Sequence, residues 1–185
     1  MDDVDGLLAD LARWKADTRA DVAARSRMRE RWLRQQAEED ARFAGLALDL
    51  SEAGATVALR LTSGRTLHGR IATVARDFCV VRHGGGTATL LAFDAVATVR
   101  PEPGYRAGQA ASERGAAVDA TLADVLVGLA GERPRVRVVT EGGGDALAGE
   151  LRSVGADVAT LRLDGDRGGN VYVHLCAVLE VTLLG

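Results

Sequence analysis

Two parts of the 185-residue chain repeat one another, and this repeat limits the possible folds more than any other feature of the sequence. The matching residues lie about 80 positions apart, a spacing at which each copy is a complete supersecondary unit. The matched pairs are Gly69 with Gly149, Val74 with Val154, Asp77 with Asp157, Arg82 with Arg162, Ala95-Val96 with Ala177-Val178 and Val99 with Val181. The chain is therefore predicted to build the same small unit twice.

The first copy shows the period-two alternation that is typical of short strands. Val57, Leu59 and Leu61 alternate with smaller or polar residues, and the hairpin turn Ser63-Gly64-Arg65 follows them. Further strands are predicted at about 67–74, 78–82, 87–93 and 97–100, with a single 3₁₀ turn at 94–96. Five short strands in about 45 residues are typical of a small β-barrel.

A long helix is predicted ahead of the first copy. Residues 7–43 contain neither Gly nor Pro and are rich in Ala, Arg, Glu and Leu. Apolar residues recur at helical spacing as far as Leu46 and Leu50, but polar residues interrupt the series at 18–25 and at 36–39. An uninterrupted coiled coil is therefore disfavoured, and a helix that packs locally at its two ends or a helical hairpin fits equally well.

These patterns together predict an α+β fold, with a long N-terminal helix followed by two tandem helix-plus-five-stranded small β-barrels. The expected boundaries are 1–44 for the helical segment, 45–100 for the first unit, 101–115 for a linker and 116–185 for the second unit. An unpaired edge strand exposes its backbone groups and must be paired, covered or charged. We therefore expect the fifth strand of one barrel to pair with the fourth strand of the other within one chain, at 97–100 or 179–183 and 87–93 or 171–175.

The first copy resembles the Sm-like (LSm) family of small β-barrels. The residues that carry the resemblance are Val57, Leu59, Leu61, Ser63-Gly64-Arg65, Leu67, Gly69 and Ile71. The layout is also similar to that of proteins from high-GC bacteria with a helix ahead of such a barrel. The resemblance implies that both barrels are of Sm or SH3-like type, and it implies RNA or DNA binding. However, the Asp and Asn that read the base in RNA-binding members are replaced. Their places hold Ala75 and Cys79 in the first copy, and Gly155 and Ala159 in the second.

Charge and composition favour protein binding over nucleic-acid binding. The net charge of -3 excludes a protein held to nucleic acid by bulk charge alone. We expect a non-enzymatic adaptor or assembly protein that binds a protein partner or forms a homo-oligomer. Trp and Met are enriched at protein interfaces, so the candidate contacts are Trp14, Met28 and Trp32. The alternative is an RNA- or DNA-binding regulator that uses Arg25, Arg29, Arg60, Arg65 and Arg70.

Other classes of function are not supported by any motif. His68, His83 and His174 have no metal-ligand spacing, and the glycine runs lack the Lys-Ser/Thr of a phosphate loop. No catalytic residue, cofactor, metal or small-molecule substrate is therefore predicted, since a small barrel is filled by its own side chains. No apolar run is long enough to span a membrane and the first residues are acidic, so we expect a cytoplasmic protein with reduced cysteines.

Overall fold

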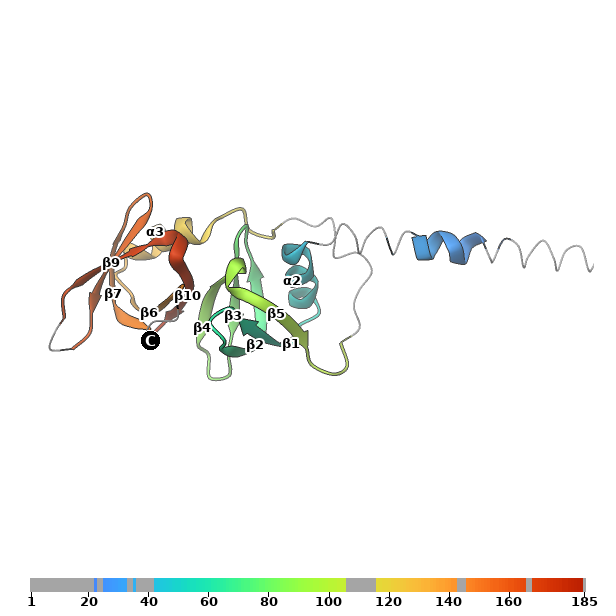
Figure 1. Cartoon of the computed structure of the whole chain (residues 1–185), viewed down its shortest axis with the longest axis horizontal. Coiled ribbons are helices and arrows are strands. Elements are labelled where there is room, and N and C mark those ends of the chain that lie inside the picture. The colour runs from blue at the N-terminus through green and yellow to red at the C-terminus, as the bar shows by residue number, and fades with distance from the viewer. Residues whose placement is uncertain are drawn as a thin grey trace, which may run out of the picture.

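The computed structural model of the chain describes residues 22, 25–32, 35, 42–105, 116–142, 146–165 and 168–184 (Figure 1). Its elements in chain order are α2 (Phe43–Glu52), β1 (Thr56–Leu61), β2 (Thr66–Val74), β3 (Phe78–Arg82), β4 (Ala88–Ala92), η1 (Phe93–Ala95), β5 (Val96–Pro101), α3 (Leu122–Ala130), β6 (Arg135–Thr140), β7 (Leu147–Val154), β8 (Val158–Leu163), β9 (Asn170–His174), η2 (Leu175–Ala177) and β10 (Val178–Leu183). The five strands predicted in the first copy are confirmed, as is a 3₁₀ turn before the fifth.

The ten strands form one antiparallel sheet in the order β5-β1-β2-β3-β4-β10-β6-β7-β8-β9. The prediction of two five-stranded small barrels of Sm or SH3-like type is therefore wrong. The strand β4 pairs with β10 from the other half of the chain, and this pairing satisfies backbone groups on both edges. The sheet continues from one half into the next instead of closing, and in the described part of the chain it ends at β5 and β9.

The prediction of a long N-terminal helix is also wrong. The helical residues described ahead of α2 are 22, 25–32 and 35, and the other residues of the segment 1–41 lie outside the described part. Arg42 is extended, with φ -111° and ψ 147°, immediately before α2 begins. An extended residue interrupts the helical hydrogen bonds, so Leu46 and Leu50 belong to a separate short helix. Neither the described helical residues nor α2 and α3 provide a segment long and apolar enough to cross a membrane.

The two halves of the sheet have the same internal strand order, β5-β1-β2-β3-β4 and β10-β6-β7-β8-β9. A bulge interrupts the pairing of β2 with β3 between Ile71 and Thr73. The corresponding bulge interrupts the pairing of β7 with β8 between Leu151 and Ser153. The sequence repeat is thus matched by a structural repeat, down to the same irregularity at the same place in each half.

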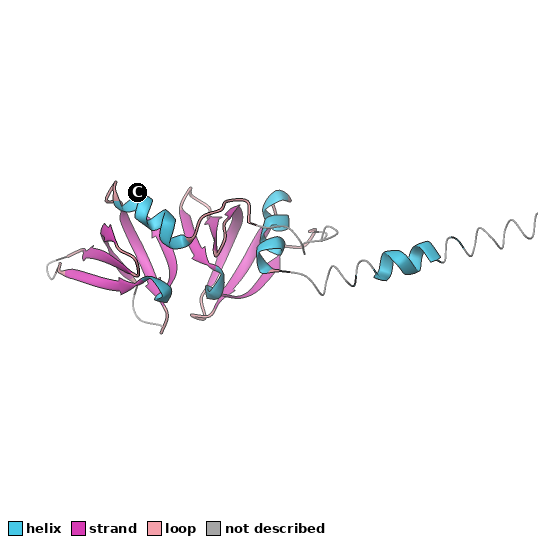
Figure 2. Ribbon diagram, turned by 90° about the horizontal axis from the view of Figure 1, so that it is seen from above, coloured by secondary structure: helices cyan, strands magenta, loops and turns pink. Residues whose placement is uncertain are grey.

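Two apolar clusters fill the interior, and each contains side chains from both halves. The first cluster includes Leu50 of α2 and Leu59 of β1, together with Leu179 of β10. The second cluster includes Leu126 of α3 and also Leu90 of β4, which belongs to the first half of the sheet. Each half therefore buries apolar surface of the other, which stabilises their side-by-side arrangement (Figure 2).

The chain that leads into α3 is attached to the turn between β2 and β3. The Val118 N–H donates to the Val74 carbonyl at 3.1 Å. The Leu122 N–H, at the start of α3, donates to the Asp77 side chain at 2.8 Å. Thr121 and Asp124 form a capping box at the same helix end. The free N–H groups at the start of α3 are therefore bonded by Asp77 and by the capping box.

Candidate functional site

The most informative contact in the molecule is the junction between β4 and β10, in the left part of Figure 1, where the orange and red half of the sheet meets the green half. Leu91 lies opposite Glu180, Leu90 opposite Val181 and Thr89 opposite Thr182. The predicted pairing of the 179–183 strand with the 87–93 strand within one chain is therefore confirmed. This junction is an observed example of how a fifth strand of one copy of the repeat binds a fourth strand of the other.

An ion pair between a buried carboxylate and a partly exposed arginine crosses this junction. Glu180 of β10 is 1% exposed, and both oxygens of its carboxylate accept hydrogen bonds at 3.0 Å from the Arg65 Nη1. Arg65 lies in the turn between β1 and β2, so the pair joins the two halves. Burial raises the pKa of Glu180 above its usual range, while Arg65 and Arg137 oppose this rise. The carboxylate therefore depends on its arginine partners to stay ionised inside the protein.

A chain of hydrogen bonds lies beside the ion pair. The hydroxyl oxygens of Thr89 and Thr182 are 3.0 Å apart, and the Thr89 Oγ1 lies 3.0 Å from the His83 Nε2. The His83 Nδ1 lies 3.0 Å from the His68 carbonyl oxygen, which can only accept, so this nitrogen carries a proton. In the neutral ring, Nε2 then accepts from Thr89. The contact between Thr89 and Thr182 therefore joins β4 to β10 through their side chains, in addition to the backbone pairing.

The strands at the two ends of the sheet, β5 and β9, repeat the strands of the junction. Their outer edges have no partner strand among the described residues. By the sequence repeat, β9 corresponds to β4, and β5 corresponds to β10. Tyr172 of β9 is 70% exposed, whereas its equivalent Leu90 on β4 is 4% exposed. Thr98 of β5 is exposed, whereas its equivalent Glu180 is buried. The same strands are therefore buried where they pair and exposed where they end the sheet.

The first half also has an arginine face, formed by Arg60, Arg70, Arg82 and Arg100. Residues directly opposite in an antiparallel sheet share a face. Arg70 lies opposite Arg82, Arg60 opposite Thr98, and Arg100 opposite Ala58. All four arginines are exposed, and in the described part of the chain none of them forms an ion pair with a carboxylate.

In the second half, the charges around the position equivalent to Arg70 are balanced. Glu150 corresponds to Arg70 in the repeat, and it lies opposite Arg135 on one side and Arg162 on the other. Glu150 also pairs with Arg152 at 3.4 Å. Like charges directly opposite one another are unfavourable, so the Arg70 and Arg82 pair has a cost that the second half avoids. The arginine face is therefore suited to a bound anion.

The structure separates the predicted nucleic-acid contacts. Arg60 and Arg70 share the arginine face, but Arg65 points into the junction and pairs with Glu180. Arg25 and Arg29 lie in the exposed helical residues 25–32. Arg82 and Arg100 were not among the predicted contacts, although period-two alternation places each of them on the outward face of its strand.

Two of the three residues predicted to contact a protein partner, Met28 and Trp32, belong to the described part of the chain. Met28 is 70% exposed and Trp32 is 62% exposed, and a spacing of four residues places them on the same side of a helix. Trp14 lies outside the described residues. Two large apolar side chains left in water form a surface that a partner is able to bury.

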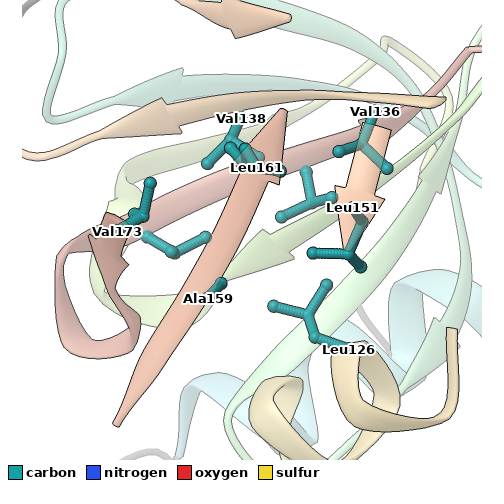
Figure 3. Close-up of a pocket in the computed structure, with 9 residues that line it drawn as sticks. Leu126, Val136, Val138, Leu151, Ala159, Leu161 and Val173 are labelled. Atoms are coloured by element: carbon teal, nitrogen blue, oxygen red, sulfur yellow. The ribbon is translucent and has the colours of Figure 1, made fainter. Parts of the chain in front are cut away.

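The second half encloses a small apolar space, shown in Figure 3. Its volume is about 10 Å³, and side chains such as Leu126, Leu151 and Leu161 point into it. A water molecule needs about this volume and also polar partners, which this lining does not offer. The space is a packing defect and not a ligand site.

The cysteines and histidines of the described residues form neither a metal site nor a reactive cluster. The described residues hold no group of three or more His, Cys, Asp or Glu that would bind a metal ion. Burial raises the pKa of Cys79 to about 12, so this thiol stays protonated and unreactive. The exposed Cys176 lies 2.8 Å from the His174 Nδ1, and within the described part of the chain this pair is not joined by a third His, Cys, Asp or Glu that would complete a metal site.

Comparison of the sequence with models of protein families and with curated proteins finds no match.

Proposed function

We propose that this chain is a non-enzymatic adaptor or assembly protein that binds other polypeptides by strand addition at the free edges of its sheet. The exposed pair Met28 and Trp32 provides a second contact surface. Strand addition supplies main-chain hydrogen bonds for affinity, and side chains on alternate positions supply specificity.

The observation that supports this proposal is the junction of β4 and β10. In it, a strand of one half completes the edge of the other half, and the ion pair of Arg65 with Glu180 joins the two halves. The edges β5 and β9 repeat these two strands and remain open in the described part of the chain. A chain that builds one such junction internally has the matching surfaces for another.

A photoreactive amino acid on each edge tests this proposal. We expect a benzoylphenylalanine at position 172 or 98, in the full chain expressed in cells, to become covalently linked to a polypeptide on irradiation. Both positions are exposed at the free edges, so a partner strand would lie against them. Mass spectrometry of the product identifies the linked polypeptide and the segment in contact.

The matched control places the same group at Glu132, which is exposed in the turn after α3 and lies on no strand. Equal linking at 132 would mean that the label only reports random collisions. Absence of any polypeptide product at both edge positions would refute binding by strand addition.

A second function, binding of a nucleic acid, is favoured by the arginine face. Arg70 and Arg82 lie opposite one another without a carboxylate between them, whereas Glu150 occupies the equivalent position in the second half. Phosphate groups would neutralise this pair and release counterions, which makes binding strongly dependent on salt.

The substitution Arg70→Glu tests this second function, because it copies the charge pattern of the second half. We expect it to abolish the salt-dependent binding of a mixed-sequence RNA oligonucleotide, measured by fluorescence anisotropy at several salt concentrations. The fold should remain intact, since a Glu opposite Arg82 is worth about 0.2–1 kcal/mol over like charges.

The matched control is Arg133→Glu, which makes the same charge change at an exposed turn of the second half. If both variants weaken binding equally, the affinity depends on net charge and not on the arginine face. If the unsubstituted chain binds no RNA at low salt, the second function is ruled out.

A further inference from the structure

We infer that the partner at these edges is a second copy of the same chain, with β9 of one copy pairing antiparallel to β5 of the next. This inference rests on the proposed binding at the sheet edges and names its occupant. The register that the repeat predicts places Val173 opposite Thr98, Tyr172 opposite Val99 and Val171 opposite Arg100.

The predicted register is copied from the junction within the chain. There, Leu91 pairs with Glu180, Leu90 with Val181 and Thr89 with Thr182. Each of these residues has an equivalent about 82 positions away on a free edge, because one unit is repeated. The free edge of β9 thus corresponds to the edge of β4 that pairs with β10, and β5 corresponds to β10.

The exposure of the edge residues shows what such a contact would cover. Leu90 is 4% exposed and belongs to the apolar cluster of the opposite half. Tyr172, its equivalent, is 70% exposed. In a second copy, Tyr172 would lie against Val99 and the first apolar cluster, where Phe43 of α2 is only partly buried. The contact would therefore bury an exposed aromatic ring on a surface of matching chemistry.

The shape of β5 does not prevent this pairing. A bulge interrupts its pairing with β1 between Arg60 and Leu61, and bulges often protect sheet edges. However, β10 has a bulge at the equivalent place, between Val178 and Glu180, and it still pairs with β4. Pro101 corresponds to Leu183, which lies outside the three residue pairs of the junction.

Charge favours a copy of this chain as the occupant. Residues 51–100 contain six arginines and three acidic residues, whereas residues 135–185 contain five arginines and seven acidic residues. A contact of β9 with β5 brings the acidic half of one copy against the basic half of the next. Complementary potentials of this kind speed association and exclude other arrangements.

The contact must form between chains, because β5 and β9 are the two opposite ends of one ten-stranded sheet. It joins two different edges, so each copy keeps one edge free after the first contact. Such head-to-tail contacts produce a closed ring or an open filament, and not a simple two-fold dimer. Thr98 replaces Glu180, so the contact has no counterpart of the ion pair between Glu180 and Arg65. We therefore expect a reversible contact weaker than the internal junction.

Disulfide linking of the full chain tests the pairing and its register. We expect the variant Arg100→Cys with Val171→Cys, in a Cys176→Ser background, to form linked chains on mild oxidation and to release them on reduction. The equivalent residues Thr182 and Thr89 have hydroxyl oxygens 3.0 Å apart, so thiols at the two edges would meet. Sedimentation of the unsubstituted chain should show mass increasing with concentration.

Each single cysteine variant in the same background is the matched control, because it links only like edges. Linking of either single variant as fully as the double variant would overturn the head-to-tail arrangement. An unsubstituted chain that remains monomeric at every concentration would overturn self-association. If that chain nevertheless becomes linked to a different polypeptide through position 172, the proposed function stands and only this inference fails.

Discussion

Replacing Gly149 by Ala should lower the free energy of unfolding by about 3 kcal/mol, the upper range for overpacking a well-packed site. A Cβ at this position would overlap the backbone carbonyl of Arg162 on the neighbouring strand β8. A backbone group cannot rotate away like a flexible side chain, so β7 and β8 would have to separate. Urea unfolding followed by circular dichroism measures the loss.

The repeat supplies both a replicate and a control for this experiment. Gly69→Ala should have a similar effect, because a Cβ there would overlap the carbonyl of Arg82. Gly128 lies within α3 and has nothing within 4 Å of the position of a Cβ. Gly128→Ala should therefore raise stability by about 0.5–1 kcal/mol, since Ala is the better helix former. Equal losses in all three variants would contradict the close approach of the strands.

The substitution Arg65→Ala should destabilise the fold by about 2 to 3 kcal/mol at neutral pH, because it leaves a buried carboxylate without its hydrogen-bond donor. Glu180 is 1% exposed, and Arg65 donates to both of its oxygens. The side chain of Arg65 is 42% exposed, so solvent screening keeps the loss below that of a fully buried pair. Arg60→Ala is the matched control, since Arg60 is exposed without an ion pair in the described part of the chain.

The ion pair of Arg65 with Glu180 also makes the stability of the fold depend on pH. Burial raises the pKa of Glu180 above its ordinary value of 4.5. At pH values between 4.5 and the raised pKa of the folded state, the folded state binds more protons than the unfolded state. The free energy of unfolding therefore falls as the pH rises through this window. Removing Arg65 raises the pKa of Glu180 further and extends the window to higher pH.

Unfolding at a series of pH values checks this sign. The difference between the unsubstituted chain and Arg65→Ala should be largest at neutral pH and should shrink in acid, where Glu180 is protonated in both. Glu180→Gln should remove the dependence in this window. A difference that is the same at acid and neutral pH would show that Arg65 acts by packing and not through the carboxylate.

The candidate sites were only partly predictable from the sequence. Arg65 was grouped with Arg60 and Arg70 because all three are basic and lie close together in the chain. Its actual partner, Glu180, lies 115 residues away, and no local pattern indicates a contact at that separation. Met28 and Trp32 were identified from residue type alone, and both proved to be exposed.

The strands, the turns and the repeat follow from the sequence alone, because local periodicity and glycine at tight turns specify them. The repeat also predicted that a fifth strand pairs with a fourth, but which of the two possible pairs forms depends on non-local packing. A sequence that alternates apolar and polar residues is equally compatible with a closed barrel and with a continuous sheet, since both bury the same apolar face of each strand. The choice came from β4 and β10, where Leu90 and Leu179 each enter the apolar cluster of the opposite half. That packing is non-local, and it replaces two closed units by one ten-stranded sheet with β5 and β9 at its ends.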